Sequence, residues 1–389
     1  MKKKKVLVSF IEAGQGHIVT AEAIAEKLEQ IYGEEIEVVR QYTFRDSGDK
    51  TLQDYEKFSI GEVLKANKHK SRLFFQCVMM KLFGERSSLR FVYSTVFKKV
   101  RNKIIKAYQK EDADLVLSTY FATYHAGIVG RNKKQLRAKI VAYNPDHNTH
   151  GWWDRRGDMF ICNNPAATNE AINVRKMPKE IVETVNFMCR ESVANTTQSK
   201  EFYREKLGIP ADKFVVMLAD GAYGMAKLEE FTNELIKTRL PITIMPLCGK
   251  NEKLLSHYES IKNLMPENVT LIPLPFLSNV AEYYKASDLF VTKAGPNALT
   301  DCVFMGTPVM TNFYTGPIEK ASSELFTKTF KVGTYCPDSK KAKEIIEEYI
   351  KNPSLLDEMR QNTKKLDMSK NGATECAHLI AQMLGIERR

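Results

Sequence analysis

The 389-residue chain lacks several features that would assign it to a class of protein outright. None of its apolar runs approaches the roughly 18 residues that span a bilayer. The apolar stretch behind the N-terminal lysines ends at Glu12, without a small-residue cleavage site. The seven cysteines are scattered and never spaced as CxxC, which favours buried free thiols over disulfides or zinc. These absences predict a cytoplasmic protein without a metal site.

Acidic residues are scarce in one segment only. Between Lys57 and Lys110 there are 14 Lys and Arg but only two acids, Glu62 and Glu85, so this excess accounts for the whole net charge of +11. A charge confined to one segment argues against a protein that coats nucleic acid generally. It favours a local contact with something anionic.

Short β-branched runs alternate with longer helical patterns along most of the chain. This alternation is typical of parallel sheets flanked by helices. The predicted strands form two series, at 6–10, 35–41, 115–119, 139–143 and 159–162, then at 214–219, 242–247, 269–272, 289–292 and 308–311. We therefore predict an α/β protein of two doubly wound, Rossmann-like domains that face one another across a cleft.

The basic segment interrupts the first series. Its apolar cluster consists of Leu73, Phe74, Phe75, Met79, Met80 and Phe83. A helix is predicted next, with Leu89, Val92, Val96, Val100 and Ile104 on one face, and with Lys98, Lys99 and Arg101 mostly off it. Large apolar side chains beside dense positive charge are typical of a segment that lies on an anionic membrane. We predict membrane contact for the cluster and these three basic residues, whereas the apolar stripe is expected to pack on the sheet.

Glycines and a histidine follow the first predicted strand. Gly14 and Gly16 would lie in a loop before a helix predicted at 19–32. They would let the backbone approach a ligand at the start of that helix, where unpaired N–H groups favour anions. His17 comes directly after them, which predicts an imidazole in the crevice above the strand ends.

A second polar loop follows the strand at 139–143. It contains Asp146, His150, Trp152 and Trp153, and these are both of the tryptophans in the chain. Polar and aromatic residues at the carboxyl end of a parallel strand are typical of a binding loop. The tryptophans could face an apolar acceptor or the bilayer interface, and one of the two is expected to fill the domain interface instead.

Three loops of the second series suit a sugar diphosphate. Each follows a predicted strand, and two lead into helices. Their candidate residues are Gly221 and Gly224, then Lys293, Gly295, Pro296, Asn297 and Asp301, then Glu319. A carboxylate such as that of Asp301 offers only acceptors, as two ribose hydroxyls require.

These motifs, in this order, resemble those of the monogalactosyldiacylglycerol synthases and the processive diacylglycerol glucosyltransferases. The peptidoglycan GlcNAc transferase is a more distant relative. The resemblance covers nearly the whole chain. It implies a GT-B glycosyltransferase whose acceptor domain comprises 1–188, with the basic insert at 57–110 and a C-terminal helix at 371–389 crossing back. Residues 189–370 would bind a UDP-sugar.

The resemblance also implies roles for single residues. In the acceptor domain, His17 matches an essential His, Asp146 matches a candidate general base, and His150 and Trp152 match the acceptor loop. The matching donor positions are Phe276 for the uracil, Gly295 and Pro296 for the phosphates, Asp301 for the ribose and Glu319 for the hexose. The chain departs from the family at Asp220, which stands where a Gly lies beside the phosphates.

The predicted function is that of an inverting, metal-independent hexosyltransferase with no cofactor. It would move a hexose from a UDP-sugar to a hydroxyl of diacylglycerol or a glycosyl-diacylglycerol, with either His17 or Asp146 as the base. We expect it on the inner face of the cell membrane, attached peripherally and without a nucleic-acid partner. The alternatives are a GT-B transferase that acts on a soluble apolar molecule or a DNA base, a sugar-nucleotide epimerase or hydrolase, and an inactive membrane-binding module.

Overall fold

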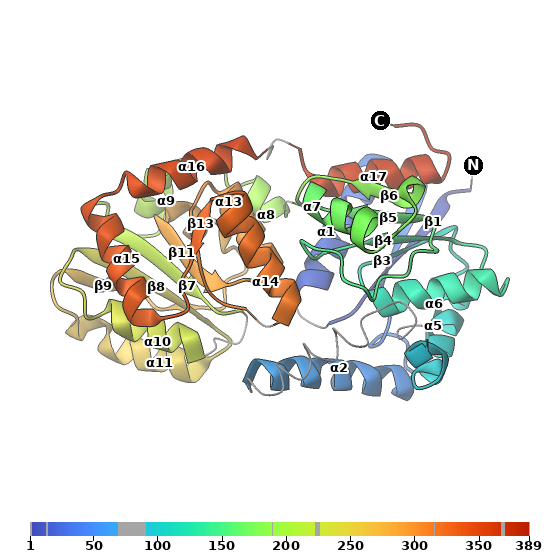
Figure 1. The fold of residues 1–389 in the computed structure, drawn as a ribbon, viewed down its shortest axis with the longest axis horizontal. Coiled ribbons are helices and arrows are strands. Elements are labelled where there is room, and N and C mark those ends of the chain that lie inside the picture. The colour runs from blue at the N-terminus through green and yellow to red at the C-terminus, as the bar shows by residue number, and fades with distance from the viewer. Residues whose placement is uncertain are drawn as a thin grey trace. The chain divides into compact units, whose positions relative to one another are not determined.

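The computed structural model describes residues 2–12, 15–68, 91–188, 190–221, 226–314, 316–366 and 370–388. The chain forms two compact units. The first consists mainly of residues 1–188 and 369–389, and the second mainly of residues 189–368. Each unit has a parallel sheet with helices on both faces, as the alternating sequence pattern predicts (Figure 1).

The sheet of the first unit has six parallel strands. They are β1 (Lys4–Phe10), β2 (Ile36–Tyr42), β3 (Leu115–Ser118), β4 (Lys139–Tyr143), β5 (Met159–Cys162) and β6 (Val182–Thr184). Their spatial order is β2-β1-β3-β4-β5-β6. The central strands are apolar along their length because both of their faces are buried.

Two layers of helices cover that sheet. On one face, α1 (Gln15–Tyr32) and α17 (Gly372–Met383) pack on alternate residues of β1, such as Val6 and Val8. On the other face, Leu7 belongs to a core shared with three helices. These are α2 (Lys50–Lys68), α5 (Lys98–Glu111) and α6 (Phe121–Asn132), and the short helix α7 (Pro165–Asn169) follows β5.

The sheet of the second unit has seven parallel strands, with β9 beside β8 and the rest in the order β10-β8-β7-β11-β12-β13. They are β7 (Phe214–Ala219), β8 (Ile242–Gly249), β9 (Val269–Leu271), β10 (Leu274–Pro275), β11 (Leu289–Lys293), β12 (Val309–Phe313) and β13 (Gly333–Tyr335). One face is buried by α10 (Ala226–Leu235), α11 (Glu252–Ile261) and α15 (Ser339–Lys351), through residues such as Leu228, Tyr258 and Ile346.

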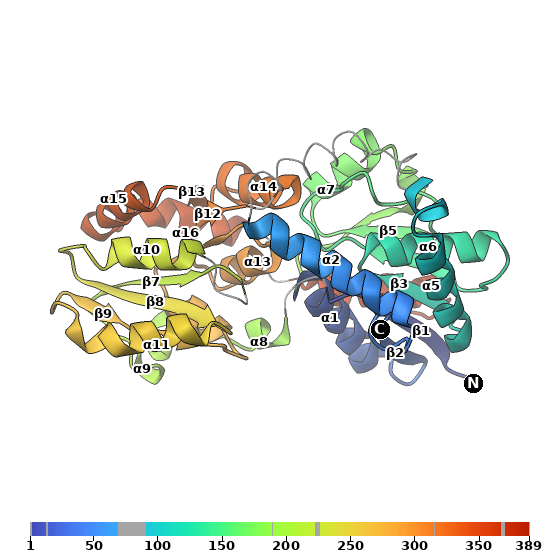
Figure 2. The same cartoon turned by 90° about the horizontal axis from the view of Figure 1, so that it is seen from below.

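The remaining described helices of the second unit also surround its sheet (Figure 2). They are α8 (Glu191–Ala194), α9 (Lys200–Lys206), α12 (Ala281–Ala286), α13 (Pro296–Phe304), α14 (Gly316–Glu324) and α16 (Leu355–Lys365). No helix within the described ranges is long and apolar enough to cross a membrane. The five described cysteines are buried free thiols, as their spacing predicts.

Both sheets have a point where the strand order reverses. In the first unit β1 lies between β2 and β3, and in the second unit β7 lies between β8 and β11. The loops that leave β1 and β3 therefore diverge to opposite faces of the sheet, and so do those that leave β7 and β11. Such a switch point opens a crevice at the carboxyl ends of the strands, where ligands bind in this class of fold.

Three predictions were wrong, two about helices and one about a side chain. The first helix begins at Gln15, so Gly16 and His17 lie in its first turn instead of in a preceding loop. The apolar stripe does not form one helix, because residues 95–97 make a turn before α5 and leave Val96 70% exposed. Arg101 is 5% exposed, so its guanidinium is not available for the membrane contact predicted for it.

Candidate active site

His17 is fixed at the switch point of the first unit. Its Nδ1 lies 2.7 Å from the carbonyl oxygen of Thr119, and the Thr119 hydroxyl donates to the backbone oxygen of His17 at 3.1 Å. Thr119 directly follows β3, so the contact joins the first turn of α1 to the segment that leaves β3. Because a carbonyl oxygen can only accept, the neutral ring carries its proton on Nδ1 and keeps a lone pair on Nε2.

Burial also controls the charge of this imidazole. Desolvation lowers the pKa of His17 below its ordinary value, and the hydrogen bond to Thr119 opposes this effect only partly. The ring of Tyr120 meets that of His17 edge to face, with 5.4 Å between centroids. At neutral pH the site therefore holds an unprotonated imidazole of fixed orientation.

The polar loop after β4 lies close to His17. His150 is 7% exposed, and burial lowers its pKa to about 3, with a smaller contribution from the positive charge of Arg175. The backbone N–H of Trp152 donates to His150 Nδ1 at 3.2 Å, so His150 carries its own proton on Nε2. That nitrogen faces Asp146 Oδ2 at 3.7 Å. The structure thus groups His17, His150 and Asp146 in one unit.

Asparagines hold the backbone of this loop. Asn144 Oδ1 accepts from the Asp146 N–H at 3.2 Å, and Asn163 Nδ2 donates to the Asp146 carbonyl at 3.2 Å. The two tryptophans differ in burial, since Trp153 is 2% exposed and belongs to the core of the first unit. Trp152 is half-buried and lies on Phe121, with ring centroids 4.9 Å apart. Trp152 is thus the tryptophan left partly open to a ligand.

A lysine lies at the switch point of the second unit. Lys293 ends β11, and its Nζ pairs with Glu319 Oε1 of α14 at 2.7 Å. Its side chain also reaches the loop after β7, where a Cβ added to Gly221 would lie 3.3 Å from Lys293 Cε. Gly221 has a φ of +77°, which few residues other than glycine adopt. The structure therefore brings together Gly221 of the loop after β7, Lys293 at the end of β11 and Glu319 of α14.

The next helix, α13, begins in the predicted phosphate loop. Gly295 is its N-cap and Pro296 its first residue, so the positive end of the helix dipole lies here. Asn297 follows, and its amide nitrogen is buried without a hydrogen-bond partner among the described residues. This part of the loop is suited to an anion.

Asp301 is less open than the sequence suggests. Its side chain is 4% exposed, and its carboxylate accepts from the guanidinium of Arg190. Burial raises the pKa of Asp301, and the positive charge of Arg190 opposes the rise. A contact with a ribose would require Arg190 to share or release this carboxylate.

Phe276 has an exposed ring. It directly follows β10 and is 57% exposed, with Lys250 Nζ 5.8 Å from its ring centroid. Several predicted positions lie outside the described residues, namely Gly14, Gly224, Leu73, Phe74, Phe75, Met79, Met80 and Phe83.

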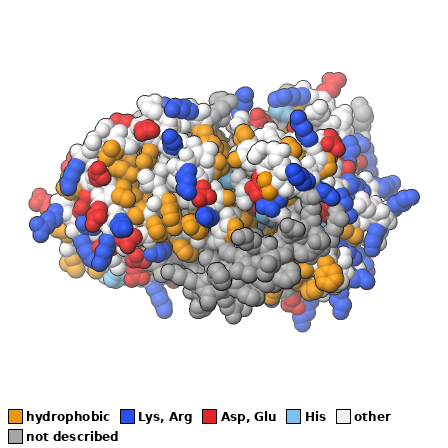
Figure 3. Space-filling model, in the orientation of Figure 1, with side chains coloured by type: hydrophobic (Ala, Val, Ile, Leu, Met, Phe, Trp, Pro, Cys, Tyr) orange, Lys and Arg blue, Asp and Glu red, His pale blue; other side chains and the backbone are white. Residues whose placement is uncertain are grey.

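The described flank of the basic segment exposes apolar and basic side chains together. Phe91 is 66% exposed and Val96 is 70% exposed, and the exposed Lys98 and Lys99 follow them at the start of α5. Lys and Arg side chains are visible over the part of the first unit that carries α5 and α6 (Figure 3).

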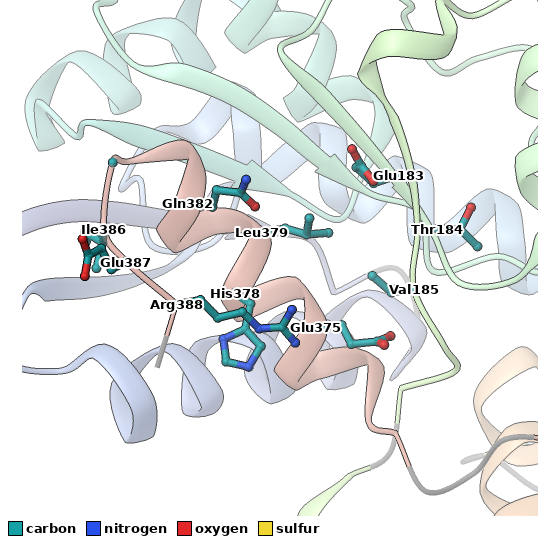
Figure 4. Close-up of a pocket in the computed structure, with 11 residues that line it drawn as sticks. Glu183, Thr184, Val185, Glu375, His378, Leu379, Gln382, Ile386, Glu387 and Arg388 are labelled. Atoms are coloured by element: carbon teal, nitrogen blue, oxygen red, sulfur yellow. The ribbon is translucent and has the colours of Figure 1, made fainter.

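A groove of about 690 Å³ lies elsewhere on the first unit, along β6 and α17. His378 and Glu375 of α17 line it together with residues of the C-terminal tail (Figure 4). The Nδ1 of His378 is 2.7 Å from the hydroxyl of Tyr32, so this imidazole is engaged within the fold. None of the predicted site residues lines the groove.

Sequence reasoning missed the partners of the predicted residues. The carbonyl of Thr119 that orients His17 belongs to the backbone and has no signature in the sequence. The one signal for this contact was that Thr119 directly follows a predicted buried strand, because the ends of neighbouring parallel strands lie close together. Arg190, which pairs with Asp301, lies 111 positions away and outside any motif.

Comparisons with known proteins give the class of the protein. Residues 226–315 match the glycosyltransferase family 28 C-terminal domain. The chain is 21% identical over 385 residues to a processive diacylglycerol beta-glucosyltransferase of Bacillus licheniformis, covering 97% of this chain and 95% of the relative. It is 22% identical to monogalactosyldiacylglycerol synthase 2 of Arabidopsis thaliana, covering 94% of this chain and 78% of that one.

The fold agrees with these matches. MurG of Acinetobacter baumannii superimposes with a TM-score of 0.64 at 14% identity, covering 98% of this chain and all of that one. The chain thus has the GT-B glycosyltransferase fold, and part of its second unit matches the family 28 C-terminal domain. It is a glycosyltransferase related to the diacylglycerol glycosyltransferases, so the predicted enzyme class, a hexosyltransferase, is confirmed.

Proposed function

We propose that the protein transfers a hexose from a UDP-sugar to a hydroxyl of a lipid acceptor, diacylglycerol or a glycosyl-diacylglycerol, with inversion at the sugar C1. The observation that carries this proposal is the oriented imidazole of His17, in a chain that carries a family 28 glycosyltransferase domain. The full-length similarity to enzymes named for diacylglycerol and monogalactosyldiacylglycerol supports the acceptor class.

The chemistry is a single in-line displacement. The acceptor oxygen forms a bond to C1 as the bond from C1 to the diphosphate oxygen breaks, and UDP leaves. The acceptor proton passes to Nε2 of His17, which carries a lone pair because Nδ1 donates to Thr119. Asp146 is the second candidate base, but its carboxylate already faces the N–H of His150. We assign it the role of orienting the acceptor loop.

The second unit would hold the donor. The start of α13 offers N–H groups and a helix dipole to the diphosphate, which is how charge on the leaving group can be met without a metal ion. The Glu319 carboxylate, held by Lys293, would accept hydroxyls of the hexose. Phe276 presents an exposed ring and backbone to a uracil.

The first unit would dock on an anionic membrane. Phe91 and Val96 offer apolar surface next to Lys98 and Lys99, and each basic residue near such a surface contributes about 1 kcal/mol of binding. These described residues support the prediction made for the apolar cluster at 73–83. On this basis we propose a peripheral attachment.

A labelled-product assay tests the proposal. The protein is incubated with radiolabelled UDP-glucose, UDP-galactose or UDP-N-acetylglucosamine and with vesicles of diacylglycerol in phosphatidylglycerol, and the lipids are then extracted. Label in the lipid phase from one donor is the expected result. Label that stays in a soluble product, or a converted UDP-sugar without lipid, would instead support a soluble acceptor or an epimerase.

A further inference from the structure

One buried acid lies where the strand order of the second unit reverses, and it has no role in the proposed sugar transfer. Asp220 directly follows β7 and is 3% exposed. Its Oδ1 accepts from Asn312 Nδ2, at the end of β12, at 3.2 Å. Its Oδ2 is buried and has no hydrogen-bond partner among the described residues. A buried carboxyl oxygen without a partner is costly, and it needs an explanation.

The charged neighbours of Asp220 do not fully compensate a carboxylate. Lys293 of β11 is the cation that acts on it, but the ammonium of Lys293 is paired with Glu319 of α14. The backbone N–H groups of Lys293 and of Leu228, on α10, also favour the ionised form, although neither makes a hydrogen bond to Oδ2. Burial outweighs all of these and raises the pKa of Asp220 to about 6. The ammonium of Lys293 thus interacts with two carboxyl groups, those of Glu319 and Asp220.

A sugar diphosphate would bring two further negative charges to this cluster. An ionised Asp220 would repel them in a setting of low dielectric, whereas a neutral carboxyl group carries an O–H that can donate to a phosphate oxygen. The unpartnered Oδ2 is the atom available to carry that proton.

We propose that Asp220 binds the donor diphosphate as a neutral carboxylic acid, through a hydrogen bond donated by Oδ2, so that each donor bound above neutral pH brings one proton with it. The inference rests on the proposed function, since it places the UDP-sugar at the start of α13. It makes Asp220 a determinant of donor affinity, and it implies a donor that binds best in mildly acidic conditions.

The expected effect is large. If only the protonated form binds, the dissociation constant rises about tenfold per pH unit above the pKa, which amounts to about 50-fold between pH 6 and pH 8. The probe is the intact UDP-sugar, because free UDP has a terminal phosphate whose own pKa lies near 6. In a UDP-sugar that phosphate is esterified and does not titrate in this range.

Calorimetry with UDP-glucose, UDP-galactose and UDP-N-acetylglucosamine from pH 5.5 to 8.5 tests the proposal. Each titration is run in two buffers of different ionisation enthalpy, which gives the number of protons taken up. The variant is Asp220→Asn, whose amide donates at every pH, and the control is Asp212→Asn, an exposed acid of the same unit. The wild type and the control should lose affinity above pH 6 with about one proton taken up. Asp220→Asn should bind equally well throughout.

Two outcomes separate this inference from the function on which it rests. UDP-sugar binding that is independent of pH in the wild type, or a pH dependence that persists in Asp220→Asn, overturns the role of Asp220 and leaves the transferase intact. Failure of every UDP-sugar to bind at pH 5.5 overturns the proposed donor and this inference with it. An infrared difference spectrum of wild type minus Asp220→Asn at pH 5 provides a ligand-free test, because the absence of a carboxylic acid band would also overturn the proposal.

Discussion

Both units place their candidate residues where the strand order of the sheet reverses, but the two sets of residues differ in chemical character. At the first switch point, the loops after β1 and β3 hold a neutral imidazole against a backbone carbonyl, with an aromatic ring beside it. At the second, the loops after β7 and β11 meet at a lysine with two carboxyl groups close to it. An acceptor hydroxyl needs a proton acceptor, whereas an anionic donor needs positive charge and hydrogen-bond donors. The difference between the units thus follows the difference between their proposed ligands.

Removing the imidazole of His17 should have the largest effect on turnover. His17→Ala should lower the turnover number by about 10³-fold, because a positioned general base contributes 10²- to 10⁴-fold. The affinity for UDP-sugar should not change, since the donor residues belong to the second unit. Turnover is measured with labelled donor and affinity by calorimetry. His257→Ala, at an exposed position of α11, is the control. Full turnover in His17→Ala would refute the assignment.

Asp220→Asn should stabilise the protein at high pH. The pKa of Asp220 is raised from 3.8 to about 6, so the native state disfavours its ionised form. The wild type therefore loses stability as pH rises from about 4 through 6, and the loss amounts to about 3 kcal/mol. Urea unfolding at pH 8 should show the gain in Asp220→Asn and at pH 4 almost none. Equal gains at both pH values would show that ionisation is not the cause.

The membrane surface of the first unit has no expected counterpart in the second. The double variant Lys98→Gln/Lys99→Gln should weaken binding to phosphatidylserine vesicles by about 30-fold, from about 1 kcal/mol for each lysine. Vesicle sedimentation at fixed salt measures the effect. The matched control is Lys340→Gln/Lys341→Gln, two adjacent exposed lysines of α15. A loss of the same size in the control would assign binding to overall charge instead of to this surface.

The smallest predicted effect concerns the partner of His17. Thr119→Val removes the hydroxyl that donates to the backbone of His17 but keeps the carbonyl that accepts from Nδ1. Loss of one such bond is worth about 1 kcal/mol, so turnover should fall about fivefold. A loss as large as that of His17→Ala would mean that the hydroxyl, and not the carbonyl, orients the ring.

The sequence predicted the strong elements of the fold and missed the weak ones. The strands at 139–143, 159–162 and 214–219 have the predicted bounds, because buried parallel strands are continuous apolar runs. The missed strands β6, β10 and β13 have two or three residues each and lie at sheet edges, too short for a pattern. The stripe around Val96 was misjudged because a turn at 95–97 interrupts the helical period.

The candidate site was predictable as residues but not as contacts. Motifs identified His17, Lys293 and Glu319, yet the carbonyl that orients His17 and the ion pair between the other two depend on which strands are neighbours. Asp220 was visible as an acid in a glycine position. Its burial and its unpartnered oxygen required the structure.

The pH dependence of turnover at saturating UDP-sugar tests the central assignment most directly. At saturating UDP-sugar the effect of Asp220 on donor affinity no longer changes turnover, so the pH dependence reports the titration of the base. Because burial lowers the pKa of His17 below the ordinary value of a histidine, turnover should change little between pH 7.5 and 8.5 and should fall in acidic solution. Turnover that still rises tenfold between pH 6.5 and 7.5 would contradict a buried, neutral His17 as the base.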